Sequence, residues 1–388
     1  MIVGVVSETH PGEKRVALTP IGLGPLSKAG LSVLVQAGAG QGAGFADQDF
    51  EAKGAKIAAS RNELLQQADI VCCIRVQGAA GFRSGQTVVG LVDPLSNAAL
   101  ARDLASAGAR VFALELLPRI TRAQSMDVLS SQATIAGYKA VLLAASHLPR
   151  MMPMMMTAAG TIPAAKAFVI GAGVAGLQAI ASCRKLGAVV TAYDVRPAVK
   201  EQIESLGAKF LQIELAGAQA EGQGGYAKAM DEEFYRKQRE LMGGAVKVAD
   251  VVITTAAVPG AKAPVLITAD MVRAMPAGSV IVDLAAKPGQ TGGNCELTQP
   301  DQTTAVNGVT ILGPTNLPAT VPQTASQLFA KNLATFLMNI VKDGQLKIDK
   351  SDQITADTML CEGGEVTNDR VRKILGLPDR AATAAAAT

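Results

Sequence analysis

A chain of 388 residues suggests two domains, and its apolar content of 49% allows a sizeable core. Aromatic residues make up only 3% of the chain, so this core must be built from Ala, Val, Ile, Leu and Met. The net charge is +3 and no basic run with interleaved aromatic residues is present, which argues against nucleic-acid binding.

The five cysteines show no CxxC spacing, so we expect reduced thiols and neither disulfides nor a zinc site. The first residues enter a strand pattern at once, which predicts no signal peptide. The weakly charged stretch from Met151 to Cys183 is interrupted by Lys166, prolines and glycines. Because no uninterrupted apolar segment reaches the ~20 residues of a spanning helix, we expect a soluble chain.

Strand and helix patterns alternate from the N-terminus, which predicts that the first ~120 residues form their own parallel α/β unit. Strands are expected at 1–6, 31–36, 69–74, 87–92 and 110–114, and helices at 20–30, 61–67 and 98–107. Apolar residues then recur at helical spacing from Leu129 to His147. This long helix is expected to run from the first lobe into the second.

The stretch from Lys166 to Asp194 reads KAFVIGAGVAGLQAIASCRKLGAVVTAYD. A short apolar run meets the glycine-rich segment 171–176, a helical pattern continues to Leu186, and a second apolar run ends at Asp194. This order of strand, glycine turn, helix and strand is typical of a dinucleotide-binding fold, and the acid stands at its expected place. A glycine-rich turn in an ordinary α/β core is the simpler alternative.

Each glycine of this segment has a predicted role. Gly171 permits the tight turn, Gly173 lets the backbone approach a pyrophosphate, and Gly176 lets the helix pack closely on the strand. Val174 and Ala175 follow at the start of the helix, where free N–H groups and the helix dipole favour an anion.

Asp194 is expected to choose the nucleotide. Its carboxylate would accept hydrogen bonds from a ribose 2′-OH and would repel a 2′-phosphate, which favours NAD over NADP. Arg196 weakens this preference, because an arginine at that place can hold a 2′-phosphate.

The remaining patterns predict a second α/β unit. Helices are expected at 198–206, 231–242, 268–275 and 323–341, and strands at 209–213, 250–254, 279–283 and 309–312. Residues 216–226 have the composition of a mobile loop, and 381–388 that of a disordered tail. We therefore expect two Rossmann-like, doubly wound parallel-sheet domains separated by a cleft, formed by 1–128 with 318–388 and by 129–317.

A second group of polar residues lies in the segment ELLPRITRAQSMDVLSSQ, residues 115–132, between a strand and the long helix. Such a segment lies outside the strand ends of an open α/β sheet, where ligands bind. Its side chains suit a nicotinamide carboxamide and ribose. They equally suit an ordinary loop in which Asp127 or Ser130 caps the helix, and the spacing alone leaves both interpretations open.

Several motifs resemble one family. They are PRITRAQSMDVLSSQ, PMMMTAAGT, GAGVAGLQAI, GGYAKAM and LFAKN, and they are similar to the NAD(H)-binding component of proton-translocating nicotinamide nucleotide transhydrogenases. The first motif is specific, whereas the glycine segment is shared with many dehydrogenases. The resemblance implies a homodimer and hydride transfer from NADH to NADP⁺ held by a separate subunit. It also implies that a membrane-spanning subunit couples the transfer to proton movement.

The resemblance assigns roles within the polar segment. Asp127 and Ser130 fall on residues that contact the carboxamide and ribose of NAD(H), Arg119 on one that fixes the ring, and Gln124 on one that reaches the NADP(H) nucleotide. Tyr226 falls on a loop residue that closes over bound NAD(H). The expected setting is a soluble subunit held by partner subunits at the inner face of the cell membrane.

Alanine dehydrogenases share this fold and are the main alternative. Amino-acid oxidation needs a general base, usually His, and the matching region Val88–Asn97 holds none. The resemblance places their catalytic Asp near Lys287, while Arg15 and Arg75 could hold a carboxylate or form ordinary ion pairs. Direct transfer between two nicotinamides needs aligned rings and excluded water, without acid or base. An NAD-sensing module without catalysis is a third possibility.

The methionine-rich stretch Met151–Met156 allows two interpretations. A packed core is the default, and an adaptable surface against the nicotinamide or a partner protein is the alternative.

Overall fold

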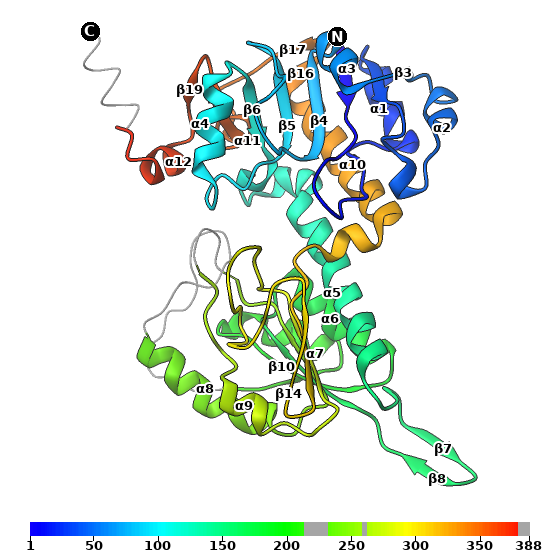
Figure 1. Cartoon of the computed structure of the whole chain (residues 1–388), viewed down its shortest axis with the longest axis vertical. Helices are drawn as coiled ribbons and strands as arrows, with labels where there is room; N and C mark the ends of the chain where they lie inside the picture. Colours follow the sequence, from blue (N-terminus) through cyan, green and yellow to red (C-terminus); the bar gives the residue numbers. More distant parts are fainter. Residues whose placement is uncertain (213–231, 258–261, 379–388) are drawn as a thin grey trace. The chain divides into compact units, whose positions relative to one another are not determined.

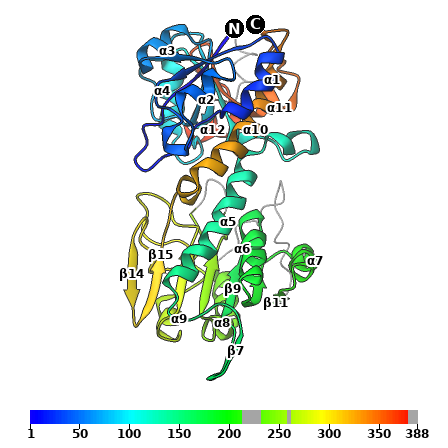
Figure 2. The ribbon, with the colours of Figure 1, turned by 90° about the vertical axis from the view of Figure 1, so that its right-hand side faces the viewer.

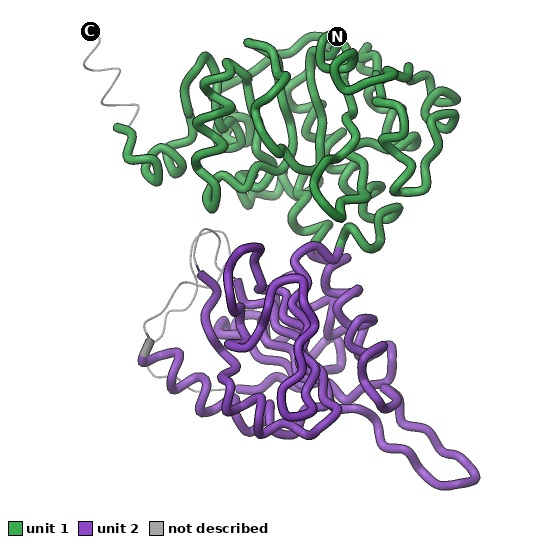
Figure 3. The backbone as a smooth tube through the Cα atoms, viewed as in Figure 1, with its two compact units in different colours: residues 1–132, 318–388 green, residues 133–317 purple. Residues whose placement is uncertain are grey.

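The structure is a computed structural model that describes residues 1–212, 232–257 and 262–378 (Figure 1). The chain forms two compact units, Met1–Gln132 with Pro318–Thr388 and Ala133–Leu317 (Figure 3). Each unit is built on one large sheet in which parallel pairing dominates. The predicted α/β class is confirmed. The expected mobile loop at 216–226 and the tail at 381–388 lie outside the described residues.

The sheet of unit 1 has eight strands in the order β19-β18-β6-β5-β4-β1-β2-β3. Pairing is parallel from β3 to β6, whereas β18 is antiparallel to β6 and to β19. The central strands are buried on both faces, which explains their unbroken apolar runs. The strands are β1 (Ile2–Val5), β2 (Ser32–Gln36), β3 (Lys56–Ala58), β4 (Ile70–Arg75), β5 (Thr87–Leu91), β6 (Arg110–Ala113), β18 (Met359–Glu362) and β19 (Glu365–Val366).

Helices cover both faces of this sheet. The helices and 3₁₀ turns of unit 1 are η1 (Pro20–Gly22), α1 (Leu23–Lys28), η2 (Gln41–Ala43), α2 (Asp47–Glu51), α3 (Arg61–Gln67), α4 (Ala98–Ser106), η3 (Leu114–Leu116), η4 (Thr121–Met126), α10 (Pro322–Ile340), α11 (Gln353–Thr358) and α12 (Asp369–Ile374). One core cluster joins the sheet to α1 and α10, and the other joins it to α3 and α4. On α10, Phe336 meets Phe112 of β6 edge to face, with ring centroids 5.5 Å apart.

The sheet of unit 2 has seven strands in the order β11-β10-β9-β12-β13-β15-β14, and only β14 is antiparallel to its neighbour. Its strands are β9 (Lys166–Ile170), β10 (Val189–Tyr193), β11 (Lys209–Phe210), β12 (Val251–Thr254), β13 (Val280–Asp283), β14 (Thr303–Val306) and β15 (Val309–Leu312). Helices α5 (Val128–His147), α6 (Val174–Lys185) and α7 (Lys200–Ser205) pack on one face, and α8 (Glu232–Val246) and α9 (Ala269–Arg273) on the other (Figure 2).

Both sheets contain the strand order 3-2-1-4-5-6 of a doubly wound Rossmann fold. The order reverses between β1 and β4 in unit 1, and between β9 and β12 in unit 2. In such sheets, ligands bind outside the carboxyl ends of the strands at these switch points. The two switch points are therefore the first places to look for a site.

Several elements differ from the sequence-based expectation. The strand expected at 209–213 covers only Lys209–Phe210, and β18, β19 and β14 were not predicted. A hairpin of β7 (Met155–Thr157) and β8 (Gly160–Ile162) was also missed, and all six of its strand residues are exposed. The packed-core interpretation of the methionines is therefore wrong for this hairpin, because the side chain of Met156 is 82% exposed.

Helix α5 is the one helix of the described residues that is long and apolar enough to cross a membrane. In this structure its residues Ala140, Val141 and Ala144 are buried in the core of unit 2. Packing buries 39% of the most apolar stretch of α5, so it covers only part of this helix.

Candidate functional site

The switch point of unit 2 carries the glycine turn that joins β9 to α6. Gly171 has a φ of +93°, and a Cβ atom there would lie 2.6 Å from Oγ1 of Thr255. A Cβ on Gly176 would lie 1.8 Å from the carbonyl oxygen of Gly171. Both positions therefore need glycine, one for the turn and the other for close packing of the helix on the strand.

Gly173 differs from these two glycines, because a Cβ atom built on it meets nothing within 4 Å. Its carbonyl accepts from the amide of Leu177 at 2.8 Å, so the helix begins here, and Val174 in the first turn is exposed. Ala175 packs against Gly137 of α5, where a Cβ would lie 2.1 Å from the Ala175 carbonyl oxygen. The backbone at Gly173 is thus open at a helix N-terminus, which fits a pyrophosphate group.

Asp194 follows β10 beside this turn and is only 8% exposed. Its Oδ2 accepts from the amide of Ala172 at 2.7 Å, which ties the acid to the glycine segment. Arg196 donates to both carboxylate oxygens, from Nε to Oδ1 and from Nη2 to Oδ2, each at 2.9 Å. The guanidinium that could hold a 2′-phosphate is therefore paired with Asp194.

A loop at the carboxyl end of β13 completes this end of the sheet, and the sequence did not identify the residues that order it. Asp283 is fully buried and accepts from Oγ1 of Thr254 and from the amide of Cys295, at 2.8 and 2.9 Å. Asn294 donates to the carbonyls of Ala256 and Pro264. An acid that ends an apolar strand is the signal that could have revealed Asp283. Lys287 lies in the same loop, partly buried.

The polar segment 115–132 belongs to unit 1, and η4 forms its middle. Arg119 and Gln124 are exposed, whereas Asp127 and Ser130 are partly buried. Oδ1 of Asp127 accepts from the amide of Ser130 at 2.9 Å, and Oδ2 accepts from its hydroxyl at 2.6 Å. Asp127 therefore makes the contacts of a helix cap for α5, as one of the two interpretations predicted.

The structure brings together Asp127 with Ser130, and Asp194 with Arg196. Tyr226 lies outside the described residues. Both histidines make local contacts: Nδ1 of His10 lies 2.9 Å from the carbonyl oxygen of Pro11, and Nδ1 of His147 lies 2.9 Å from that of Leu143.

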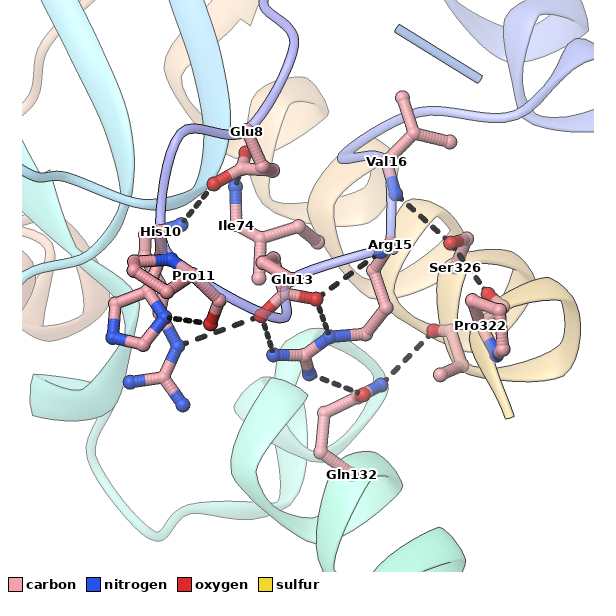
Figure 4. A network of polar contacts seen from close by, with 12 residues as sticks. Glu8, His10, Pro11, Glu13, Arg15, Val16, Ile74, Gln132, Pro322 and Ser326 are labelled. Carbon is pink, nitrogen blue, oxygen red and sulfur yellow. Dashed lines mark hydrogen bonds and ion pairs between the residues drawn. The ribbon is translucent and has the colours of Figure 1, made fainter. Parts of the chain in front are cut away.

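The switch point of unit 1 is filled by a polar network (Figure 4). Arg15 donates from Nε and Nη2 to the two carboxylate oxygens of Glu13, at 2.7 and 2.6 Å, and from Nη1 to Gln132 at 2.8 Å. The side chains of Arg15 and Glu13 are 2% and 0% exposed. Arg15 is thus a member of a buried ion pair, and Arg75 lies 3.5 Å from the same carboxylate.

Glu8 lies in the same network, directly beyond β1. Its carboxylate accepts from the amides of Ile74 and Arg75 at 2.6 and 3.1 Å. Burial raises the pKa of Glu8 to about 7, although the two backbone hydrogen bonds oppose this rise. The two switch points therefore differ: paired charges fill that of unit 1, whereas unit 2 has a glycine turn with open backbone.

Two family models match the chain. The model described as "Alanine dehydrogenase/PNT, N-terminal domain" matches residues 4–136, and "Alanine dehydrogenase/PNT, C-terminal domain" matches residues 140–369. The chain belongs to the alanine dehydrogenase/PNT family. Family membership and the doubly wound fold predicted from the sequence are both confirmed.

Relatives within the alanine dehydrogenase/PNT family include transhydrogenase subunits and alanine dehydrogenases. The chain is 44% identical over 379 residues to the first section of NAD(P) transhydrogenase subunit alpha of Rhodospirillum rubrum, covering 95% of this chain and 98% of that protein. A crystal structure of transhydrogenase from Sinorhizobium meliloti matches with a TM-score of 0.85 and 46% identity, over 94% of this chain and all of that one. Alanine dehydrogenase of Mycobacterium tuberculosis is 30% identical over 386 residues, or 97% of this chain and 98% of that enzyme.

Proposed function

We propose that this chain is the NAD(H)-binding alpha subunit of a proton-translocating NAD(P) transhydrogenase. The observation that carries the proposal is the glycine turn at the switch point of unit 2, with open backbone at Gly173 and an acid at Asp194. The similarity to transhydrogenase alpha subunits over nearly the whole chain supports the choice of reaction. NADH supplies the hydride, and NADP⁺ held by a partner subunit accepts it.

The residues of unit 2 would hold the adenosine and phosphate groups of NAD(H). The open backbone of Gly173 and the first amides of α6, at Val174 and Ala175, suit the pyrophosphate. Gly171 and Gly176 keep the turn and helix close enough for this contact. Asp194 would accept from the ribose hydroxyls, with Arg196 holding its carboxylate in place. Tyr226 is assigned to closure over the cofactor by family resemblance alone.

The segment 115–132 would act on the nicotinamide end. Asp127 and Ser130 offer a carboxylate and a hydroxyl within one hydrogen-bonded pair, which suits a carboxamide and a ribose. Arg119 and Gln124 are exposed, so Arg119 can orient the ring and Gln124 can reach a nucleotide on the partner. Hydride transfer between two nicotinamides requires aligned rings and little water, and no group of this chain needs to give or take a proton.

We further propose that the chain forms a homodimer through the β7–β8 hairpin. A two-stranded hairpin is barely stable alone, yet this one projects from unit 2 with all six strand residues exposed (Figure 1). Met154 and Met156 are 60% and 82% exposed, and such adaptable apolar side chains favour a protein contact. The remaining partners would be a membrane-spanning subunit and an NADP(H)-binding subunit. Through them the chain would sit at the inner face of the cell membrane.

One experiment tests the reaction. Purified protein is mixed with NADH, a separate NADP(H)-binding component and an NADP⁺ analogue whose reduced form absorbs at its own wavelength. We expect reduction of the analogue that needs both proteins and that falls in Arg119→Ala and Gln124→Ala. Lys347→Ala, an exposed residue of unit 1, serves as the control.

A parallel mixture contains NADH, pyruvate and ammonia in place of the analogue. Oxidation of NADH there would favour an alanine dehydrogenase. Tight NADH binding with no turnover in either mixture would favour a module that only senses NAD(H). Either result would overturn the proposed function.

A further inference from the structure

The turn η4, which carries Arg122 and Gln124, is held to the rest of unit 1 by side chains that are distant in the sequence. Nδ2 of Asn332 donates to the carbonyl of Ser125 at 2.8 Å. Nη1 of Arg122 donates to Oδ1 of Asn339 at 3.1 Å. Asn332 and Asn339 are seven residues apart on α10, so two turns of one helix face grip the segment at two points.

Asp352 provides the charge opposite Arg122. Its Oδ1 accepts from Nη2 of Arg122, and its Oδ2 accepts from Nδ2 of Asn339 at 2.9 Å and from Oγ1 of Thr355 at 2.9 Å. Asp352 also caps α11 through the amide of Thr355. Its position is therefore set by the fold around it and does not depend on Arg122.

The charge of Asp352 is stable at neutral pH. Partial burial acts to raise the pKa of its carboxyl, but hydrogen bonds from Asn339, Arg122 and Thr355 outweigh this effect and hold the pKa well below its usual range. An ionised acid in a fixed place thus faces an arginine on an exposed turn.

Stability of the fold is a poor explanation for this contact. The side chain of Arg122 is 55% exposed, and ion pairs with one exposed partner contribute on the order of 1 kcal/mol or less. What the contact fixes is position: Arg122 lies three residues after Arg119 and two before Gln124. If the contacts of Arg122 were lost, the turn could shift, and Arg119 and Gln124 would shift with it.

We propose that Arg122, Asn339 and Asp352 form a brace that positions the segment 115–132 for hydride transfer. The inference rests on the proposed function, because it gives that segment its role at the nicotinamide. Arg122 and Asp352 are positioning residues in this account. The residues beyond α10 then have a role in the reaction, because they supply the fixed anion that holds the turn.

The test compares Arg122→Ala, Asp352→Ala and the double variant with the wild type in the transfer assay. Misplacing a reacting group by about 1 Å can cost up to a hundredfold in rate, so we expect kcat to fall roughly tenfold or more. The dissociation constant for NADH should change much less than kcat, since the residues of unit 2 that we assign to the phosphates and the adenosine ribose are untouched. The double variant should lose no more than Asp352→Ala alone, because that variant already breaks the contact with Arg122 along with the other contacts of Asp352. Arg122→Lys should restore some of the rate.

Lys347→Ala is the matched control. Lys347 is 56% exposed, like Arg122, and pairs with Asp343 at 3.7 Å in unit 1. This variant should keep the wild-type kcat. An unchanged kcat in Arg122→Ala, or losses that add in the double variant, would refute the brace.

Hydrogen exchange separates this inference from the proposed function. Amides of residues 119–127 should exchange faster in Arg122→Ala and Asp352→Ala than in Lys347→Ala. If the wild-type protein shows no transfer activity, the proposed function is refuted, whereas the brace is still judged by the exchange of residues 119–127. Unchanged exchange at 119–127 would sink the brace even if the wild type transfers hydride.

Discussion

Arg196 holds the carboxylate of Asp194 with two parallel hydrogen bonds, from Nε to Oδ1 and from Nη2 to Oδ2, each 2.9 Å long. A guanidinium and a carboxylate in this fork geometry match each other in shape as well as charge. The pair is nearly buried, with side-chain exposures of 14% and 6%. The arginine that could have served a 2′-phosphate therefore supports the acid that we expect to reject one.

Asp194→Ala is expected to weaken NADH binding and to change the choice of nucleotide. Loss of hydrogen bonds to a charged group costs roughly 1.5–3 kcal/mol, or about tenfold to a hundredfold in affinity. The variant also leaves Arg196 without its carboxylate, so the ratio of NADPH to NADH affinity should rise. Fluorescence titration with both nucleotides measures this ratio.

Asp270→Ala is the control for this change, because Asp270 pairs with Arg273 on the surface and its side chain is 93% exposed. That variant should bind both nucleotides as the wild type does. An unchanged NADPH to NADH ratio in Asp194→Ala would contradict the assignment of the ribose contact.

Substitutions at two glycines of the turn should affect different properties, NADH affinity at Gly173 and the melting temperature at Gly176. Gly173→Ala places a methyl group in open space, so the melting temperature should stay near that of the wild type. The same methyl group would stand where the pyrophosphate is expected, and NADH affinity should fall at least tenfold. Gly176→Ala should instead lower the melting temperature, since its Cβ would lie 1.8 Å from the Gly171 carbonyl oxygen.

Gly243→Ala in α8 is the control, because its Cβ also meets nothing within 4 Å and alanine favours a helix. It should leave NADH affinity unchanged. Calorimetry measures the melting temperature of the three variants, and titration measures their affinity for NADH. Normal NADH binding by Gly173→Ala would contradict the proposed pyrophosphate contact.

Glu115 should make the protein less stable as the pH rises toward neutrality. Burial raises the pKa of its carboxyl from 4.5 to about 7, and the nearby charge of Asp93 adds to the rise, against hydrogen bonds from the amides of Val92 and Asp93. Between these two values the folded state binds the proton that the unfolded state has lost. The free energy of unfolding should therefore fall across this window, by roughly 3 kcal/mol in all for Glu115.

Glu115→Gln keeps an acceptor for those amides and removes the titration, so the decline between pH 5 and pH 8 should become shallower. Glu8, whose pKa burial also raises to about 7, keeps its own share of the decline. Denaturant unfolding at several pH values measures this slope. Glu362→Gln is the contrast: hydrogen bonds and ion pairs with Lys350 and Arg110 lower the pKa of Glu362 despite its partial burial. Its contribution is lost only at more acid pH, so the slope above pH 5 should not change. A wild-type slope in Glu115→Gln would contradict the prediction.

The exposed hairpin should control assembly. Met154→Glu combined with Met156→Glu places two charges on the apolar hairpin, and burying them in an interface would cost several kcal/mol. We expect a dimer for the wild type and a monomer for the variant in sedimentation experiments, with the melting temperature of unit 2 little affected. Leu241→Glu, at another exposed apolar residue of unit 2, should leave the dimer intact. A double variant that remains dimeric would refute the proposed contact.

The sequence by itself determined the local structure and the family. Apolar runs and glycine spacing predicted the central strands of both sheets and the β9–α6 turn, because these features depend on neighbours in the chain. The spacing left capping of α5 by Asp127 or Ser130 as one of two open interpretations, and the structure shows Asp127 making the cap contacts. Strand β18, which lies between β6 and the edge strand β19, escaped prediction, since its pairing with β6 joins residues about 250 positions apart.

Only the tertiary structure decided which polar residues pair. Arg15 meets Gln132 across 117 positions, and Arg122 meets Asp352 across 230. Composition could not show that the methionine stretch is exposed, because burial depends on what packs against a side chain. Contacts between distant residues have no local pattern, and these contacts hold the segment that we assign to the nicotinamide.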